Sequence, residues 1–166
     1  MGSVREPDPM ATYLVAQQQR VLEYLASFVS GGGASALSTV RTIVRALRDG
    51  ETEVLYPALS RLQLPAEIEL LLADSRDSRA HQLDALDALA HKRGSRARKL
   101  AAIELADQVQ HHFQQHMCEL IPALASRVPR ALYRSVAARF VARCQDGLDG
   151  LGRRAPARSD ERRAHE

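Results

Sequence analysis

Apolar residues recur at helical spacing along most of this chain, and this periodicity constrains its fold more than any other feature. The buried stripe of an amphipathic helix repeats every three to four residues, whereas a half-buried strand alternates every two. No stretch alternates for the length of a strand, and prolines and glycines gather between the periodic stretches, where helices are expected to end. The sequence therefore predicts an all-α fold.

Five helices are expected from this pattern. They span about residues 10–29, 35–62, 65–93, 96–127 and 129–151. Pro57 and Pro122 interrupt two of them, and a proline inside a helix removes a hydrogen bond and commonly kinks it. Four long helices and an accessory one predict an up-down four-helix bundle with an additional C-terminal helix, formed by residues 10–151. Residues 1–9 and the arginine-rich stretch 152–166 are expected to be disordered.

The length of 166 residues suits one domain with a substantial core. No apolar run approaches the ~20 residues of a membrane span, and residues 1–9 lack the apolar core of a signal peptide. We therefore expect a cytoplasmic protein without a membrane partner. The net charge is +3, and basic residues gather at residues 91–99 and from Arg153 onward, without neighbouring aromatics. A solvated loop and tail are expected there, with no nucleic-acid partner. Cys118 and Cys144 are expected to be reduced thiols.

Three ionisable residues interrupt the apolar stripes. His112 and His116 lie one helical turn apart on the stripe that also carries Leu105 and Val109. Glu51 lies near the centre of the apolar face of the second expected helix. A buried carboxylate is costly unless it is paired, protonated or bound to a cation. The obvious partners for Glu51 are the two histidines together with a metal ion.

An internal repeat connects the two parts of this cluster. Residues 54–59 resemble residues 119–124, and each segment closes the second helix of a helical hairpin, so the two halves of the chain look related. Polar residues also interrupt the first helix of each half, where Gln18 and Gln82 lie on apolar stripes. Superposing the prolines of the repeat aligns Leu47 with His112 and Glu51 with His116.

With these motifs the chain resembles the hemerythrin-like, HHE cation-binding family over about residues 10–127. Members of that family carry two helical hairpins, each with a histidine in its first helix and an H-x3-E element before a closing L-[YF]-P-x-L motif in its second. Here the closing motifs are residues 55–59 and 120–124, and the doublet His111-His112 is also typical. Glu51 and His112 match the ligand pattern. The positions that depart from it are Gln18, Leu47, Gln82 and His116.

The resemblance implies a helical bundle associated with oxygen, nitric oxide, peroxide or iron handling. From the residues themselves, Glu51, His112 and His116 form the two-histidine, one-carboxylate set of many non-haem Fe(II) sites, which also suits zinc or manganese. Gln18 and Gln82 are expected to supply a weak oxygen ligand, hold a water or orient the rings. His81 would join as a ligand only through a bulge in its helix, because a straight helical count directs it outward.

Two alternatives remain open at this point. One is a metal-free, hydrogen-bonded cluster in an interaction or regulatory module, with the accessory helix at residues 130–151 as its docking surface. The apolar stripe of that helix predicts either return packing on the bundle or a dimer contact. The other is a core that accepts haem or an organic substrate, although no haem-attachment motif is present. The favoured function is a protein with one non-haem metal ion, most simply iron, that acts on or senses O2, peroxide or NO.

Overall fold

The computed structural model describes residues 8–152, and every regular element within that range is helical. The elements are α1 (Pro9–Val29), α2 (Gly33–Gly50), η1 (Glu51–Leu55), α3 (Tyr56–Ser60), α4 (Ala66–His91), α5 (Ser95–Gln115), η2 (His116–Leu120), α6 (Ile121–Arg127) and α7 (Arg130–Gly152). The predicted all-α class is confirmed for this part of the chain. Residues 1–7 and 153–166, which we expected to be disordered, lie outside the described residues. Asp8 and Pro9 do not belong to a disordered tail, because Asp8 caps α1 and Pro9 begins it.

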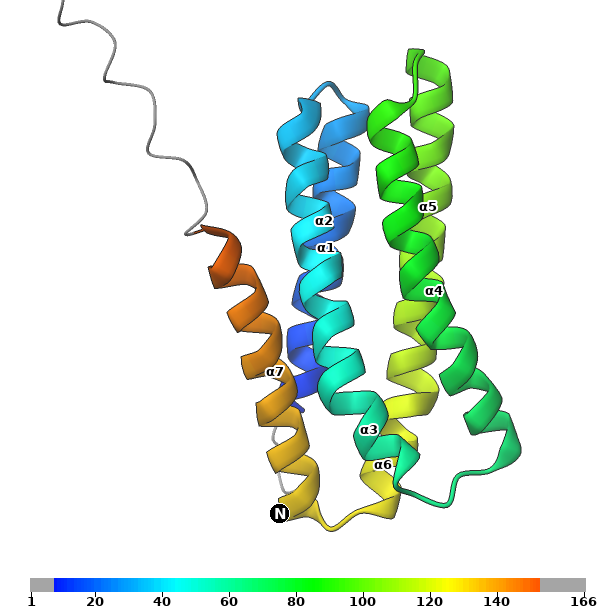
Figure 1. Cartoon of the computed structure of the whole chain (residues 1–166), viewed down its shortest axis with the longest axis vertical. Coiled ribbons are helices and arrows are strands. Elements are labelled where there is room, and N and C mark those ends of the chain that lie inside the picture. Colours follow the sequence, from blue (N-terminus) through cyan, green and yellow to red (C-terminus); the bar gives the residue numbers. More distant parts are fainter. Residues whose placement is uncertain (1–7, 153–166) are drawn as a thin grey trace, which may run out of the picture.

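The long helices lie side by side around one apolar core (Figure 1). α1 packs against α2 and α5, and α4 packs against the same two helices. α7 lies outside this group and contacts α2 and α1. The first turn of α1 is tied to α7, since Asp8 accepts hydrogen bonds from the N–H groups of Met10 and Ala11 and from the Tyr133 hydroxyl. The core between the helices is therefore closed on the side that α7 covers.

A π-helical turn lies before each of the two interior prolines. Proline has no N–H, so the carbonyl four residues before it loses its usual partner and the helix must rearrange. The backbone N–H of Tyr56, just before Pro57, donates to the carbonyl of Glu51, five residues back. The backbone N–H of Ile121, just before Pro122, donates in the same way to the carbonyl of His116. Turns of this kind are rare in proteins overall, but many of them occur at functional sites. Here the two π turns begin at Glu51 and His116, which the sequence pattern predicts as ligands.

The internal repeat extends over both hairpins with a single shift of 65 residues. That shift carries Pro57 onto Pro122 and η1 onto η2. It also carries four of the five buried residues of α1 onto buried residues of α4, with Gln17 falling on Gln82; the exception is Leu25, which falls on the exposed Ala90. The sequence had paired Gln18 with Gln82, which is one residue out of register. Gln17 is the buried glutamine of α1, whereas Gln18 is half-buried.

α7 packs back on the bundle instead of presenting its apolar stripe to solvent. This stripe consists of Tyr133, Val136, Ala137, Phe140 and Cys144, all of them buried. Gly50 permits the close approach of α2 and α7, because a Cβ at this position would lie 2.4 Å from the Cys144 sulfur. Arg143 adds a two-pronged ion pair to Glu53, with N–O distances of 2.6 and 2.7 Å. The structure thus shows return packing, one of the two alternatives expected for this stripe, and a dimer contact through α7 stays a prediction.

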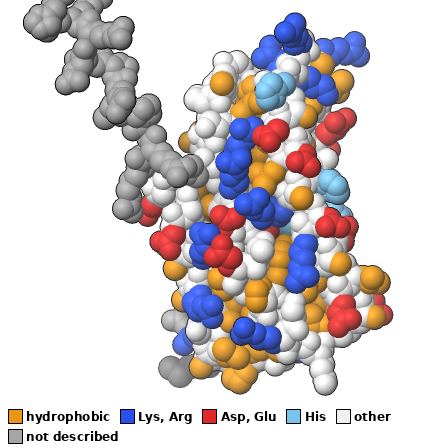
Figure 2. All heavy atoms as spheres, viewed as in Figure 1, with side chains coloured by type: hydrophobic (Ala, Val, Ile, Leu, Met, Phe, Trp, Pro, Cys, Tyr) orange, Lys and Arg blue, Asp and Glu red, His pale blue; other side chains and the backbone are white. Residues whose placement is uncertain are grey.

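The outer surface carries charges of both signs (Figure 2). On the face shown, Lys and Arg side chains gather where α4 ends and α5 begins, which matches the solvated basic loop expected at residues 91–99. Cys118 is exposed and Cys144 is buried, and both are free thiols. No helix among residues 8–152 is long and apolar enough to cross a membrane.

Candidate metal centre

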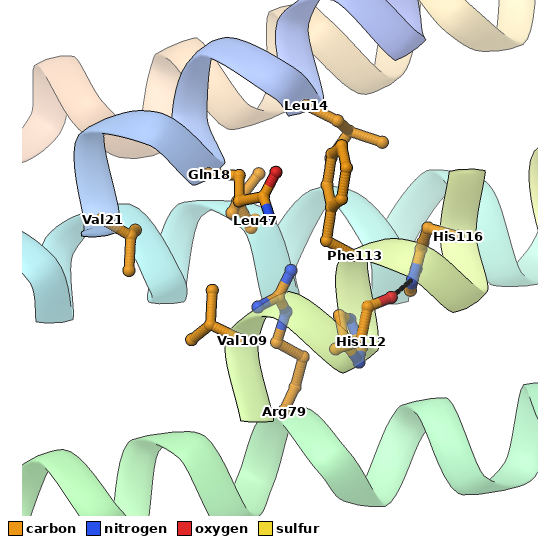
Figure 3. A pocket seen from close by; sticks show the side chains of 9 residues that line it. All are labelled: Leu14, Gln18, Val21, Leu47, Arg79, Val109, His112, Phe113 and His116. Carbon is orange, nitrogen blue, oxygen red and sulfur yellow. Dashed lines mark hydrogen bonds between the residues drawn. The ribbon is translucent and has the colours of Figure 1, made fainter. Parts of the chain in front are cut away.

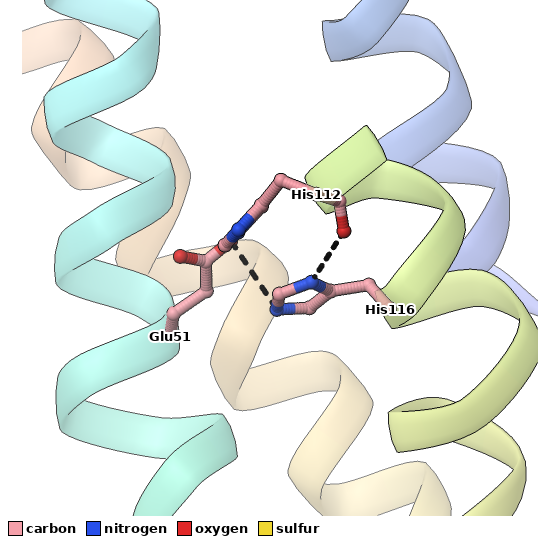
Figure 4. A group of neighbouring side chains, drawn as sticks. All are labelled: Glu51, His112 and His116. Carbon is pink, nitrogen blue, oxygen red and sulfur yellow. Dashed lines mark hydrogen bonds and ion pairs between the residues drawn. The ribbon is translucent and has the colours of Figure 1, made fainter. Parts of the chain in front are cut away.

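The structure brings the three predicted ligands together in the core. Glu51 begins η1, His112 lies in the last turn of α5, and His116 begins η2 (Figure 4). The carboxylate oxygen Oε1 of Glu51 lies 3.2 Å from Nε2 of His112 and 3.5 Å from Nε2 of His116. One ligand atom from each residue lies within 4.8 Å of the others. An ion bound at ~2.1 Å from each donor requires donor separations of roughly 3 to 3.5 Å. A small adjustment would allow all three to bind one ion, provided that the Nε2 proton of His112 moves to its Nδ1.

Burial determines the charge of each member of the group. The three side chains are at most 1% exposed. Burial lowers the pKa of His112 to about 3, with a further contribution from the nearby Arg79 guanidinium, and burial also lowers the pKa of His116. Burial alone would raise the pKa of Glu51, but Arg79 and, less strongly, the histidines lower it well below its usual value. At neutral pH the cluster therefore contains a carboxylate and two uncharged imidazoles.

The hydrogen bonds assign a tautomer to each histidine. Nδ1 of His116 donates to the backbone carbonyl of His112 at 2.9 Å, so Nε2 of the neutral ring carries a lone pair. That atom is buried and has no hydrogen-bond partner. It faces Oε1 of Glu51, which is also an acceptor. Two acceptors 3.5 Å apart repel each other unless a proton or a metal ion lies between them. The ring of His112 instead donates from Nε2 to Glu51, which leaves its Nδ1 without a partner.

Arg79 is a residue of the candidate site that the sequence pattern did not lead us to expect. It lies on α4 and is buried, and its Nη2 donates to Oε1 of Glu51 at 2.7 Å. Its Nε donates to Oε2 at 3.0 Å, which completes a two-pronged ion pair. Its Nη1 donates to the side-chain oxygen of Gln82 at 2.6 Å. The positive charge that balances Glu51 is therefore already present within the chain.

Further hydrogen bonds fix the position of the Glu51 carboxylate. The Tyr56 hydroxyl donates to Oε2 of Glu51 at 3.3 Å and lies 3.2 Å from the Ser75 hydroxyl. Burial and the Glu51 charge raise the pKa of Tyr56, so the hydroxyl keeps its proton. Tyr56 thus contacts Oε2 of Glu51, Arg79 contacts both carboxylate oxygens, and the two imidazoles approach Oε1. Tyr56 belongs to the closing motif of the first hairpin, and this contact gives that motif a role at the site.

Gln82, Gln18 and His81, the other residues predicted for the site, differ in their distance from the cluster and in their exposure. Gln82 is buried, but it accepts from Arg79 and so reaches Glu51 only through the guanidinium. Gln18 lines a cavity of about 10 Å³ together with Arg79 and both histidines (Figure 3). His81 as a ligand is wrong: α4 is an uninterrupted α-helix, so the bulge that would turn His81 inward is absent and its side chain is exposed.

The cavity beside the histidines is too small for most ligands. Its volume matches about one water molecule. Apolar side chains from α1, α2 and α5 form the rest of its wall, with Leu47 at the position where the repeat would place a second histidine. Sites for organic ligands are typically ~300 Å³ or larger. In this conformation the space beside the two histidines does not admit haem or an organic substrate.

Comparison of the chain with protein-family models, with curated proteins and with solved structures gave no match.

Proposed function

We propose that this protein is a hemerythrin-like, up-down four-helix bundle that holds one divalent transition-metal ion through Glu51, His112 and His116. The resemblance in the two closing motifs supports the family assignment, and the two matching π turns support a duplicated hairpin. The three side chains can hold a metal ion as a group. Iron bound by this ligand set would supply open coordination positions for O2, peroxide or NO, so the proposed role is the handling or sensing of one of these molecules.

One observation carries the proposal. Nε2 of His116 is a buried lone pair without a partner, and it faces a carboxylate oxygen at a distance that fits two ligands of one ion. A buried acceptor left unsatisfied costs about 1–3 kcal/mol, and a bound cation removes that cost. The hydrogen bond from His116 to the backbone of its own helix holds the ring in the orientation that binding requires.

A second candidate function rests on Arg79. A guanidinium paired with Glu51 balances the cluster without a metal ion, and two neutral imidazoles add no charge. In that case the bundle is a metal-free interaction or regulatory module, and the cluster fixes the relative positions of α2, α4 and α5. The two candidates differ in one measurable property, the binding of metal by the purified protein.

Metal titration of the purified protein separates them. We expect Co2+ to bind with one equivalent and to give the visible absorption of a site with nitrogen and oxygen ligands. His112→Ala should abolish this absorption, whereas His111→Ala should leave it intact, because His111 is the exposed neighbour on the same helix. Melting curves with and without chelator, on protein loaded with one equivalent of Zn2+, provide an independent measure.

The outcomes distinguish the candidates clearly. A binding ratio near one that requires both Glu51 and His112 supports the metal centre. Two ions per chain would contradict the single site, since Leu47 supplies no ligand for a second ion. No binding, together with a melting temperature that chelator does not change, would remove the metal proposal and leave the metal-free module.

A further inference from the structure

The charge balance of the cluster departs from that of an ordinary metal site. The Glu51 carboxylate and the Arg79 guanidinium form a buried ion pair, so their charges already cancel. A divalent ion bound to the same carboxylate would bring two further positive charges into an apolar core next to Arg79. Placing uncompensated charge in such surroundings is costly. The Arg79 guanidinium therefore competes with a metal ion for the Glu51 carboxylate.

We infer that Arg79 determines which metals the site accepts, by occupying the Glu51 carboxylate that every incoming ion must share. This inference rests on the proposed metal-binding function. Arg79 is a selectivity residue and not a ligand, because a guanidinium is always protonated and has no lone pair to donate. It contacts both carboxylate oxygens, while the two histidines approach only Oε1.

The geometry explains how Arg79 discriminates between metals. Metals that bind well to imidazole, such as Co2+ and Zn2+, draw much of their affinity from His112 and His116, which Arg79 does not contact through hydrogen bonds. Metals that prefer oxygen ligands, such as Mn2+, depend more on the Glu51 carboxylate, whose negative charge is already paired with Arg79. We therefore expect the wild-type protein to bind Co2+ and to exclude Mn2+, even though the ligand set alone would suit either.

Removing the guanidinium tests the inference directly. In Arg79→Gln, and in the uncharged, similarly long Arg79→Met, the Co2+ affinity should rise at least tenfold and the Mn2+ affinity should rise further, to a level detectable by electron paramagnetic resonance. Arg48→Gln is the matched control: Arg48 carries the same charge three positions before Glu51, but its side chain is exposed and pairs with Asp49. Its affinities should equal those of the wild type within twofold.

A measurement on the wild type covers the case in which both variants fail to fold. The Nε–H of Arg79 is buried and bonded to Glu51, so its NMR signal should shift when Zn2+ is added. A signal unchanged at saturating Zn2+, or folded variants whose affinities match the wild type, would overturn the inference while the metal centre stands. If neither the wild type nor the folded variants bind Co2+, the proposed function itself fails. Binding only after Arg79 is removed would contradict both the proposed function and the inference, because the wild-type site would then accept no metal.

Discussion

The buried pair of Arg79 and Glu51 should dominate the stability of the core, and a double-mutant cycle measures its contribution. Both side chains are at least 95% buried, and three N–O contacts of 2.7 to 3.2 Å join them. Glu51→Leu leaves a guanidinium in the core without its carboxylate, and Arg79→Met leaves the carboxylate without its cation. Removing one partner of a buried pair typically costs about 3–5 kcal/mol, because the other charge stays buried and unpaired.

The double variant should be far more stable than the sum of the two single effects implies. With both charges gone, the remaining costs are the unpaired Gln82 oxygen and the unpaired Nε2–H of His112, about 1–3 kcal/mol each, because the Tyr56 hydroxyl keeps Ser75 as a partner. We expect a coupling energy of at least about 3 kcal/mol between Glu51 and Arg79. Urea unfolding followed by circular dichroism, at pH 7 with chelator present, gives this value without any metal contribution.

The exposed ion pair between Arg143 and Glu53 is the matched control. It has the same two-pronged geometry, with N–O distances of 2.6 and 2.7 Å, but its side chains are 30% and 53% exposed. The same cycle on this pair should give a coupling of no more than about 1 kcal/mol, because water screens exposed charges. If the Glu51 and Arg79 effects add within ~0.5 kcal/mol, the pair does not neutralise the core and our reasoning about the site is incorrect.

Two further predictions follow from the packing of α7 and from the protonation of His112. Gly50→Ala should destabilise the protein by about 1–3 kcal/mol, because its Cβ would lie 2.4 Å from Cys144 Sγ, whereas Gly150→Ala, with open space around it, should not; thermal melting compares the two. The pKa of His112 falls from 6.5 to about 3 on folding, so its stabilising contribution is complete above pH 6.5 and is lost as pH drops toward 3. Chelator-treated protein should therefore lose stability steadily below pH 6.5 in urea titrations at several pH values, and His112→Phe should lose less.

The sequence was a good guide to the helices because their apolar stripes are long and regular. The expected boundaries agree with the structure within about two residues at most ends. The two π turns could not be expected in the same way, because a proline predicts only a lost hydrogen bond and not how the ladder closes around it. This matters for the site, since the extra residue in each π turn shifts the register of the residues that follow Glu51 and His116.

The clustering of Glu51, His112 and His116 was foreseeable, because each is an ionisable residue on an apolar stripe. Arg79 satisfied the same criterion and was nonetheless overlooked. The buried residues of α4 recur at intervals of three and four and are Leu72, Ser75, Arg79, Gln82, Leu86 and Leu89. The pattern therefore contained the signal, because Arg79 lies three residues before Gln82, which the sequence already placed on the stripe. A charged residue at the spacing of an apolar stripe is therefore a candidate for burial, even where few apolar residues mark that stripe.

The shift of 65 residues that relates the two hairpins shows how the cluster came to be asymmetric. It aligns Glu51 with His116, the first residues of the two π turns, so equivalent positions from the two halves face each other across the core. It also aligns Leu47 with His112 and Leu14 with Arg79, so the first half offers aliphatic side chains where the second offers an imidazole and a guanidinium. The anion thus comes from one half, and the cation and both neutral donors come from the other. A symmetric pair of ligand sets would favour two ions. If the proposed metal centre is correct, this division provides ligands for at most one ion, and its binding would depend on Arg79.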